Sequence, residues 1–170
     1  CLEIPGLQYY LFRRSYSDLQ KSYVEGPTGF NALLAPLINE GAVESVAKEI
    51  RFPNGSKIFL CHCQHEKDVF SFGSFEFHVL NIAEAGEFTE FMMNFLRSRV
   101  RAPKEFLEKL PDKFLLPREC WLNPNEKEWS IPRVTYTCNP VGPGKAFLKR
   151  NFVDVGRPGQ YWRAPAELGG

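Results

Sequence analysis

The fold of this chain is decided by the stretch FEFHVLNIAEAGEFT, residues 75–89, which changes from a strand pattern to an acidic loop and then to a helix start. The run from Phe77 to Ile82 is largely apolar and lacks Gly and Pro, which is typical of a buried strand in a parallel sheet. Ligands of open α/β sheets bind outside the carboxyl ends of the strands, so we expect Glu84 to face a ligand crevice. The alternative is that Glu84 is only the first polar residue of a solvated turn.

The residues upstream of this stretch predict a strand followed by helices. Leu7 to Phe12 is apolar and aromatic, which favours a strand that delivers Arg13-Arg14 to its carboxyl end. Ser17 is placed to cap the next helix. Apolar residues from Phe30 to Ile38 then recur at helical spacing until Gly41.

A β-hairpin is predicted next, because Val46 to Phe52 and Ser56 to Cys63 flank the pair Asn54-Gly55. Both residues of that pair tolerate positive φ, as tight hairpin turns require. The polar-to-apolar run from Glu66 to Gly73 is typical of a connector into the strand that begins at Phe77.

Downstream, Thr89 is placed to cap a helix, and Pro132 to Cys138 is a β-branched, alternating run that predicts another strand. Residues 102–130 contain four prolines and predict an elaborated surface connection with a short helix around Phe106–Leu110. Lys145 to Phe152 favours a final helix. The alternation of strands and helices predicts an α/β fold, with a mostly parallel sheet flanked by helices and an inserted β-hairpin.

The composition is that of an ordinary globular domain, with 170 residues, 44% hydrophobic residues and a formal net charge of +1. With so small a net charge, the chain as a whole does not strongly attract the negative surfaces of nucleic acids or membranes. No uninterrupted apolar run approaches the ~20 residues of a membrane span, and the odd number of cysteines suits a reducing compartment. Because the chain begins with Cys1 and ends on Gly169-Gly170, we expect a fragment cut at both ends.

A small metal-binding module is an alternative raised by the neighbouring residues Cys61, His62, Cys63 and His65. In a strand, however, Cys61 and Cys63 share one side while His62 leaves on the other. No second Cys or His pair completes four ligands, so we predict no metal here and expect the cysteines to pack in a half-buried strand.

Three stretches, in this order, resemble the ATPase domain of the large terminase subunit of tailed phages, the motor that threads viral DNA into a capsid. They are YLFRRSYSDL (residues 10–19), Phe77 to Thr89 followed by FLRSRVR (residues 95–101), and TCNPVGPGKAFLKR (residues 137–150). They are similar to the family's strand-helix passage after its nucleotide loop, its Walker B strand with an Arg-ended helix, and its coupling motif. The resemblance implies that residues 1–170 are a partial ATPase domain, a truncated P-loop NTPase core of the ASCE type.

The resemblance implies ATP hydrolysis with Mg²⁺, coupled to translocation of double-stranded DNA into a procapsid. Glu84 would position the attacking water, while Thr137 and Asn139 would sense the γ-phosphate and couple its loss to movement. One of three arginines would act as an arginine finger in a neighbouring subunit. These candidates are Arg97, Arg99 and Arg101, for which the alternative is a favourable interaction with the helix dipole.

The partners implied by the resemblance are double-stranded DNA, the portal protein and the small terminase subunit. The parent protein is expected to form a ring on the portal of the procapsid, in the cytoplasm of a bacterial host and without a membrane.

Two departures from the family pattern bear on activity. No Gly-x-x-x-x-Gly-Lys-Ser/Thr loop occurs in the chain, and in the family this loop would precede Cys1. Ala83 stands where the family has the Walker B Asp, and an alanine cannot help to hold Mg²⁺. The second hypothesis is therefore a catalytically silent terminase-like remnant, acting at most as a DNA- or subunit-binding module.

Overall fold

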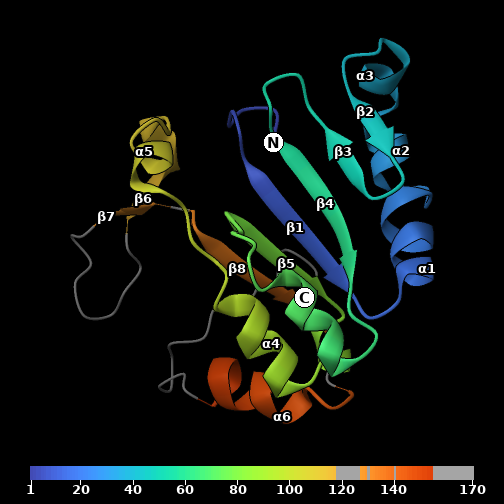
Figure 1. Cartoon of the computed structure of the whole chain (residues 1–170), viewed down its shortest axis with the longest axis vertical. Helices are drawn as coiled ribbons and strands as arrows, with labels where there is room; N and C mark the ends of the chain where they lie inside the picture. The colour runs from blue at the N-terminus through green and yellow to red at the C-terminus, as the bar shows by residue number, and fades with distance from the viewer. Residues whose placement is uncertain (118–126, 130, 140, 155–170) are drawn as a thin grey trace, which may run out of the picture.

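The computed structural model describes residues 1–117, 127–129, 131–139 and 141–154. Its central feature is a six-stranded sheet (Figure 1). In spatial order the strands are β2 (Glu44–Val46), β3 (Glu49–Arg51), β4 (Lys57–His62), β1 (Gln8–Arg13), β5 (Val79–Ala83) and β8 (Arg133–Thr137). The last four pair in parallel, while β2, β3 and β4 pair antiparallel. A separate two-stranded sheet joins β6 (Leu115–Pro117) to β7 (Lys127–Trp129).

The helical segments are short, and several continue from one helix type into another. Four helices lie between β1 and β2 in the chain. They are α1 (Tyr16–Leu19), the π-helical η1 (Gln20–Val24), α2 (Phe30–Leu33) and α3 (Ala35–Asn39). The others are the 3-10 helices η2 (Glu66–Phe72), η3 (Ala85–Glu87) and η4 (Asp112–Phe114), the α-helices α4 (Glu90–Arg97), α5 (Lys104–Leu107) and α6 (Lys145–Leu148), and the π-helical η5 (Lys149–Val153).

Helices cover both faces of the sheet, as the alternation of side chains along β1 requires. Phe12 faces one way and packs in a cluster with Leu80 and Ile82 of β5 and Met92 of α4. Leu11 faces the other way and packs against residues of β3, β4, α1 and η1. Figure 1 shows the two layers, with α4 and α6 together on one side and α1 to α3 along the other. The inner strands are therefore buried from both sides.

The order of the parallel strands creates a switch point. The chain passes from β1 to its neighbour β4, then crosses β1 to form β5 and continues to β8 on the far side. Between β1 and β5 the connections diverge onto opposite faces, and in open α/β sheets such a switch point is where ligands bind, outside the carboxyl ends of the strands. The residues that follow Arg13 and Ala83 therefore lie where proteins of this architecture bind ligands.

The structure confirms much of the predicted order of elements. The strands expected at Leu7–Phe12 and Pro132–Cys138 form β1 and β8, and the Asn54-Gly55 turn joins β3 to β4 with Gly55 at φ +80°. Thr89 caps α4, because its Oγ1 accepts a hydrogen bond from the N–H of Met92. The mostly parallel, helix-flanked α/β sheet with an inserted hairpin is also confirmed.

Two local predictions were wrong. The cap of α1 is Ser15, whose Oγ accepts from the N–H of Asp18, and Ser17 lies inside the helix. The strand expected at Val46–Phe52 is split into β2 and β3 by a turn at Ala47-Lys48. The connector expected at Glu66–Gly73 joins β4 to β5 and contains the 3-10 helix η2.

The predicted helix from Phe30 to Ile38 is interrupted at Leu34, ahead of Pro36, whose ring disfavours helical geometry in the preceding turn. The short helix expected around Phe106–Leu110 is α5. Much of the surface connection predicted at 102–130 lies outside the described residues. Among the helices of the described residues, none has the length and apolar character needed to cross a membrane.

Candidate functional site

The carboxyl ends of the parallel strands bring together most of the residues singled out by the sequence. The register pairs Arg13 at the end of β1 with His62 of β4, and Ala83 at the end of β5 with Thr137 of β8. Glu84 follows Ala83 directly and therefore lies between the ends of β1 and β8. The position of Glu84 at the carboxyl ends of the strands and its proximity to Thr137 both arise from this register.

Glu84 has an unusual backbone conformation, with φ 54° and ψ 46°. It is the one non-glycine residue of the described ranges with positive φ. This left-handed conformation costs about 1–2 kcal/mol for an L-residue with a Cβ. Its carbonyl accepts from the N–H of Glu87 at 2.9 Å, which closes the turn and directs the side chain away from the strand axis.

The carboxylate of Glu84 faces Arg13. Arg13 Nη2 lies 3.9 Å from Glu84 Oε1, and the two side chains are 15% and 36% exposed. An ion pair this long and this accessible contributes at most about 1 kcal/mol. The pair orients the acid but does not account for its backbone conformation, which other contacts must hold.

Arg13 is the last residue of β1 and Arg14 follows it, and their side chains lie on opposite faces of the sheet. Arg13 Nη1 donates to Ser22 Oγ at 3.0 Å, and its buried Nε has no hydrogen-bond partner among the described residues. Arg14 Nη1 donates to the carbonyl of Cys63 at 3.1 Å and lies 3.0 Å from Met92 Sδ. Arg14 therefore ties β4 to α4, whereas Arg13 keeps donor capacity at the crevice.

Two glycine-containing turns pack backbone to backbone beside Glu84. A Cβ added to Gly86 would lie 2.2 Å from the carbonyl oxygen of Val141, and one added to Gly144 would lie 2.5 Å from that of Phe88. The N–H of Gly144 donates to the carbonyl of Gly86 at 2.8 Å. Only glycine permits this approach, so the turn after Glu84 and the segment after Asn139 are in direct contact.

The remaining candidates at this edge differ in exposure. Thr137 and Asn139 are exposed, and the carbonyl of Asn139 accepts from the N–H of Val141 at 2.7 Å. Ala83 is 0% exposed and belongs to the apolar cluster that contains Leu11. Its side chain brings no oxygen to the edge, so Glu84 has no adjacent carboxylate on β5.

Two of the three candidate arginine fingers, Arg99 and Arg101, lie at the amino end of the parallel strands. The N–H of Phe77, before β5, donates to the carbonyl of Arg99 at 3.0 Å, so the chain has returned to the amino end of the strand. Arg99 Nη1 donates to the carbonyl of Gly73 at 2.9 Å, and Arg101 Nε lies 2.7 Å from Glu76 Oε1. Arg97 is exposed. The structure does not bring these arginines to the Glu84 of the same chain.

The cysteines of β4 are packed as the strand pattern predicts. Cys61 and Cys63 contact the core on the α4 side, while the ring of His62 lies against Tyr16 of α1. Burial raises the pKa of both thiols to about 12, which keeps them protonated and poor ligands. Within the described ranges, no three His, Cys, Asp or Glu side chains converge as a metal site would require.

Asn81 is a polar residue of the site that the sequence analysis passed over. Its Nδ2 donates to the hydroxyl of Tyr9 at 2.9 Å, and its buried Oδ1 has no hydrogen-bond partner in the part of the chain that the structure describes. It lies on the same face as Ala83, two positions along the strand. The signal was available, because Asn81 interrupts the apolar run of Phe77 to Ile82.

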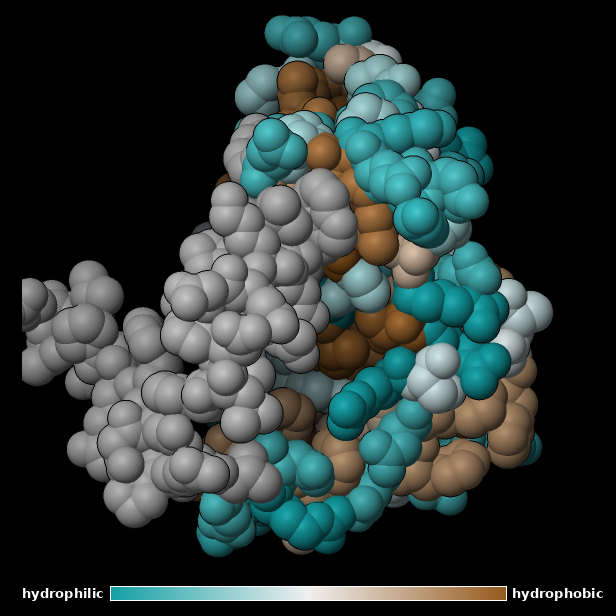
Figure 2. All heavy atoms as spheres, turned by 90° about the vertical axis from the view of Figure 1, so that its left-hand side faces the viewer, coloured by the Kyte–Doolittle hydropathy of each residue, from teal (hydrophilic) through white to brown (hydrophobic). Residues whose placement is uncertain are grey.

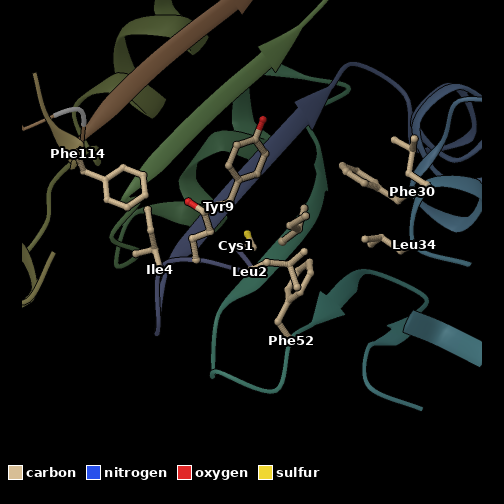
Figure 3. Close-up of a pocket in the computed structure, with 11 residues that line it drawn as sticks. Cys1, Leu2, Ile4, Tyr9, Phe30, Leu34, Phe52 and Phe114 are labelled. Atoms are coloured by element: carbon tan, nitrogen blue, oxygen red, sulfur yellow. The ribbon is translucent and has the colours of Figure 1, made fainter. Parts of the chain in front are cut away.

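A cavity of about 480 Å³ lies apart from this edge (Figure 3). Its lining is mainly apolar and includes Ile4, Phe30, Phe52 and Phe114. Tyr9 also lines it, but the hydroxyl of that residue is bonded to Asn81. The cavity does not include Glu84, so its chemistry is separate from that of the carboxyl edge.

A scan against protein-family models matched no family, and a search of curated proteins returned no match. The class of protein is therefore stated from the architecture alone. The chain is an α/β protein with a six-stranded, mostly parallel sheet flanked by helices. The terminase resemblance stays a prediction.

We expect Gly86→Ala to destabilise the fold strongly. The added Cβ would lie 2.2 Å from a backbone oxygen, which cannot rotate away as a side chain does. The loss in free energy of unfolding should exceed ~3 kcal/mol, as for other substitutions that force backbone shifts. Urea unfolding measures it.

Gly41→Ala is the matched control. Unlike Gly86, Gly41 has positive φ, +70°, but an added Cβ meets nothing within 4 Å. Only the cost of the left-handed backbone, about 1 kcal/mol, should remain. Equal losses for the two variants would contradict the backbone contact described for Gly86.

We expect Glu84→Gly to change the free energy of unfolding by less than about 1 kcal/mol, because relief of the left-handed strain offsets the greater entropy of glycine in the unfolded chain. Glycine adopts the observed φ of 54° without strain, and the Arg13 pair that is lost is long and accessible. Thermal unfolding of Glu87→Gly provides the comparison, since Glu87 is exposed and has no positive φ. A lower melting temperature for Glu84→Gly than for Glu87→Gly would show that the Glu84 backbone is not strained.

Proposed function

We propose that this chain is part of an ATP-driven motor of the large terminase type, which translocates double-stranded DNA into a procapsid. The observation that carries the proposal is the parallel pairing of β5 with β8, which sets Glu84 beside Thr137 and the Asn139 segment. These are the positions to which the resemblance assigns the water-positioning acid and the γ-phosphate sensor. The motif order in the sequence and the strand order in the sheet are therefore compatible.

The accessible carboxylate of Glu84 suits the assigned role. A residue that positions water must be reachable by solvent and held off the strand end, and Glu84 is 36% exposed in a left-handed turn. Arg13 on the neighbouring strand supplies a cation within 4 Å of it. In phosphoryl transfer such a constellation works mainly by positioning and by charge stabilisation.

The contact between Gly86 and the segment 141–144 supplies a physical route for coupling. Because the two backbones touch, a displacement of the Asn139 segment displaces the turn that holds Glu84. Packed backbones of this kind shift between discrete arrangements instead of deforming smoothly. In the proposed motor, loss of the γ-phosphate near Thr137 would move this unit.

The outer edge of β8 has no strand partner among the described residues. Among the described residues, β8 pairs with β5 alone, and a cavity of about 670 Å³ lies between β8, α6 and η5. Figure 2 views the molecule from the left-hand side of Figure 1 and shows apolar residues gathered along the middle of this face. A strand preceding a phosphate-binding loop would bring that loop next to Thr137 if it paired here in parallel.

The described residues do not by themselves fit a Mg²⁺ site. Magnesium prefers several oxygen ligands, and within the described ranges no three His, Cys, Asp or Glu side chains converge, while the buried Ala83 before Glu84 brings no oxygen. The Mg²⁺ and ATP of the proposed motor would need ligands from a phosphate-binding loop that these 170 residues lack.

A catalytically silent remnant is the second candidate, and the packing of Ala83 favours it. The side chain is 0% exposed within an apolar cluster, a setting suited to alanine and costly for a carboxylate. Such a protein would keep the fold and a DNA- or subunit-binding role without hydrolysing ATP.

The motor proposal is tested by ATP hydrolysis in two proteins, the 170-residue chain and the product of the complete gene. We expect the complete product to hydrolyse ATP in the presence of duplex DNA, and Glu84→Gln to lower kcat by ~100-fold or more, as for other positioned acid-base groups. The 170-residue chain should show no turnover. Glu87→Gln is the matched control and should retain activity.

The same experiment separates the two candidates. Turnover that depends on Glu84 in a protein with Ala83 rules out the silent remnant. A complete gene product without a phosphate-binding loop, or one that binds no nucleotide, rules out the motor.

We expect Ala83→Asp to destabilise the fold by ~2 kcal/mol or more, because the new carboxylate would lie in an apolar cluster. Thr137→Asp introduces the same charge at the exposed register partner of Ala83 and should cost less than ~1 kcal/mol. Chemical denaturation of both variants gives the comparison. Similar stabilities would mean that position 83 tolerates an acid and that its alanine is not required by packing.

A further inference from the structure

A polar groove of about 800 Å³ lies at the carboxyl end of β4, separate from the Glu84 crevice. Its walls come from three parts of the chain, which are the β2–β3 turn, β4 with the loop that follows it, and η2. Phe59 and Phe72 contribute apolar surface to it. Its cationic and imidazole side chains are Lys48, His62, His65 and Lys67.

The fold positions these side chains by backbone and ring contacts. The carbonyl of Lys48 accepts from the N–H of Leu60 at 2.8 Å, which fixes the β2–β3 turn against β4. The hydroxyl of Tyr16 donates to the carbonyl of Ala47, and the ring of Tyr16 lies against that of His62. Lys48 of the β2–β3 turn and His62 of β4 thereby line the same groove.

The acidic groups near the groove are committed to other partners. Asp68 Oδ2 accepts from the backbone N–H of His65 at 2.7 Å, which lowers the pKa of this carboxyl group and caps η2. Glu49 pairs with Arg51 and lies 3.8 Å from Lys57 Nζ. Glu66 Oε1 accepts from Thr89 Oγ1.

By contrast, Lys48 and Lys67 form no ion pair within the described ranges. Two lysines and one carboxylate, that of Asp68, line the groove, so its lining carries a net positive charge.

We propose that this groove binds phosphate groups of a double-stranded DNA backbone without reading its sequence. Lysine is a compact point charge that pairs with phosphate from many directions, and the cations are spread over separate elements of an open groove. The phosphate site follows from these observations alone. The choice of duplex DNA among polyphosphates rests on the proposed motor function, and the groove would be a DNA contact of that motor.

The test is fluorescence anisotropy of the 170-residue chain with a labelled 20-base-pair duplex, repeated at several salt concentrations and without nucleotide. We expect Lys48→Ala/Lys67→Ala to weaken binding at least tenfold at low salt. The slope of log K against log salt should become shallower by about 1 for each lysine removed. Lys48→Arg/Lys67→Arg should bind as the wild type does, since the charge is kept.

Lys21→Ala/Lys109→Ala is the matched control, because both lysines are exposed, lie outside the groove and change the net charge equally. It should bind the duplex nearly as the wild type does, and circular dichroism should give the same melting temperature for all variants. Equal weakening by the two alanine pairs would overturn the proposal in favour of a general charge effect.

Titration with inorganic pyrophosphate separates the possible ligands. Competition by pyrophosphate for the wild-type groove, together with the loss of duplex binding in the double variant, supports the proposal. Pyrophosphate binding that depends on the lysines, without duplex binding, overturns the assignment to DNA. Because this assay measures duplex binding without nucleotide, failure of the ATPase proposal and failure of this one give different results.

Discussion

The parallel pairing of β5 between β1 and β8 is the constraint on which the rest of the structure depends. It buries β5 on both faces, with Leu80 and Ile82 against α4 and Ala83 against the opposite layer. Within a strand enclosed in this way, an unpaired polar side chain costs free energy. Polar functional side chains are therefore expected after its carboxyl end. Asn81, with a buried unpartnered oxygen, is the exception and lies on the face of Ala83.

The turn after β5 is built from unfavourable local geometry that its surroundings impose. Glu84 occupies the left-handed region at a cost of about 1–2 kcal/mol, and the ion pair with Arg13 is too long and accessible to repay it. The close backbone approach of Gly86 to Val141 and Gly144 holds the turn. Strain kept by packing in this way is frequent where a side chain must be presented to a ligand.

The sequence predicted those features that depend on burial and on short-range turn chemistry. Phe77 to Ile82 could be recognised because a doubly buried strand leaves a continuous apolar run, and Asn54-Gly55 because its turn needs positive φ. The division at Ala47-Lys48 was missed, since that turn contains no Gly, Pro or Asn. Ser15 and Ser17 are equivalent on local pattern, and only the structure distinguishes them. The groove depends on the contact of the β2–β3 turn with β4, through the carbonyl of Lys48 and the N–H of Leu60, which no local pattern reports.

The cationic groove and the Glu84 crevice are separated along the same edge by the end of one strand, β1. Strands lie about 4.8 Å apart, so the ends of β4 and β5 are separated by about 10 Å. This distance exceeds the Debye length of about 8 Å at physiological ionic strength, so Glu84 repels a polyanion in the groove only weakly. Arg13, between them, further offsets the acid. The edge can therefore hold one anionic ligand at the groove while a second meets Glu84, as simultaneous DNA binding and phosphoryl transfer require.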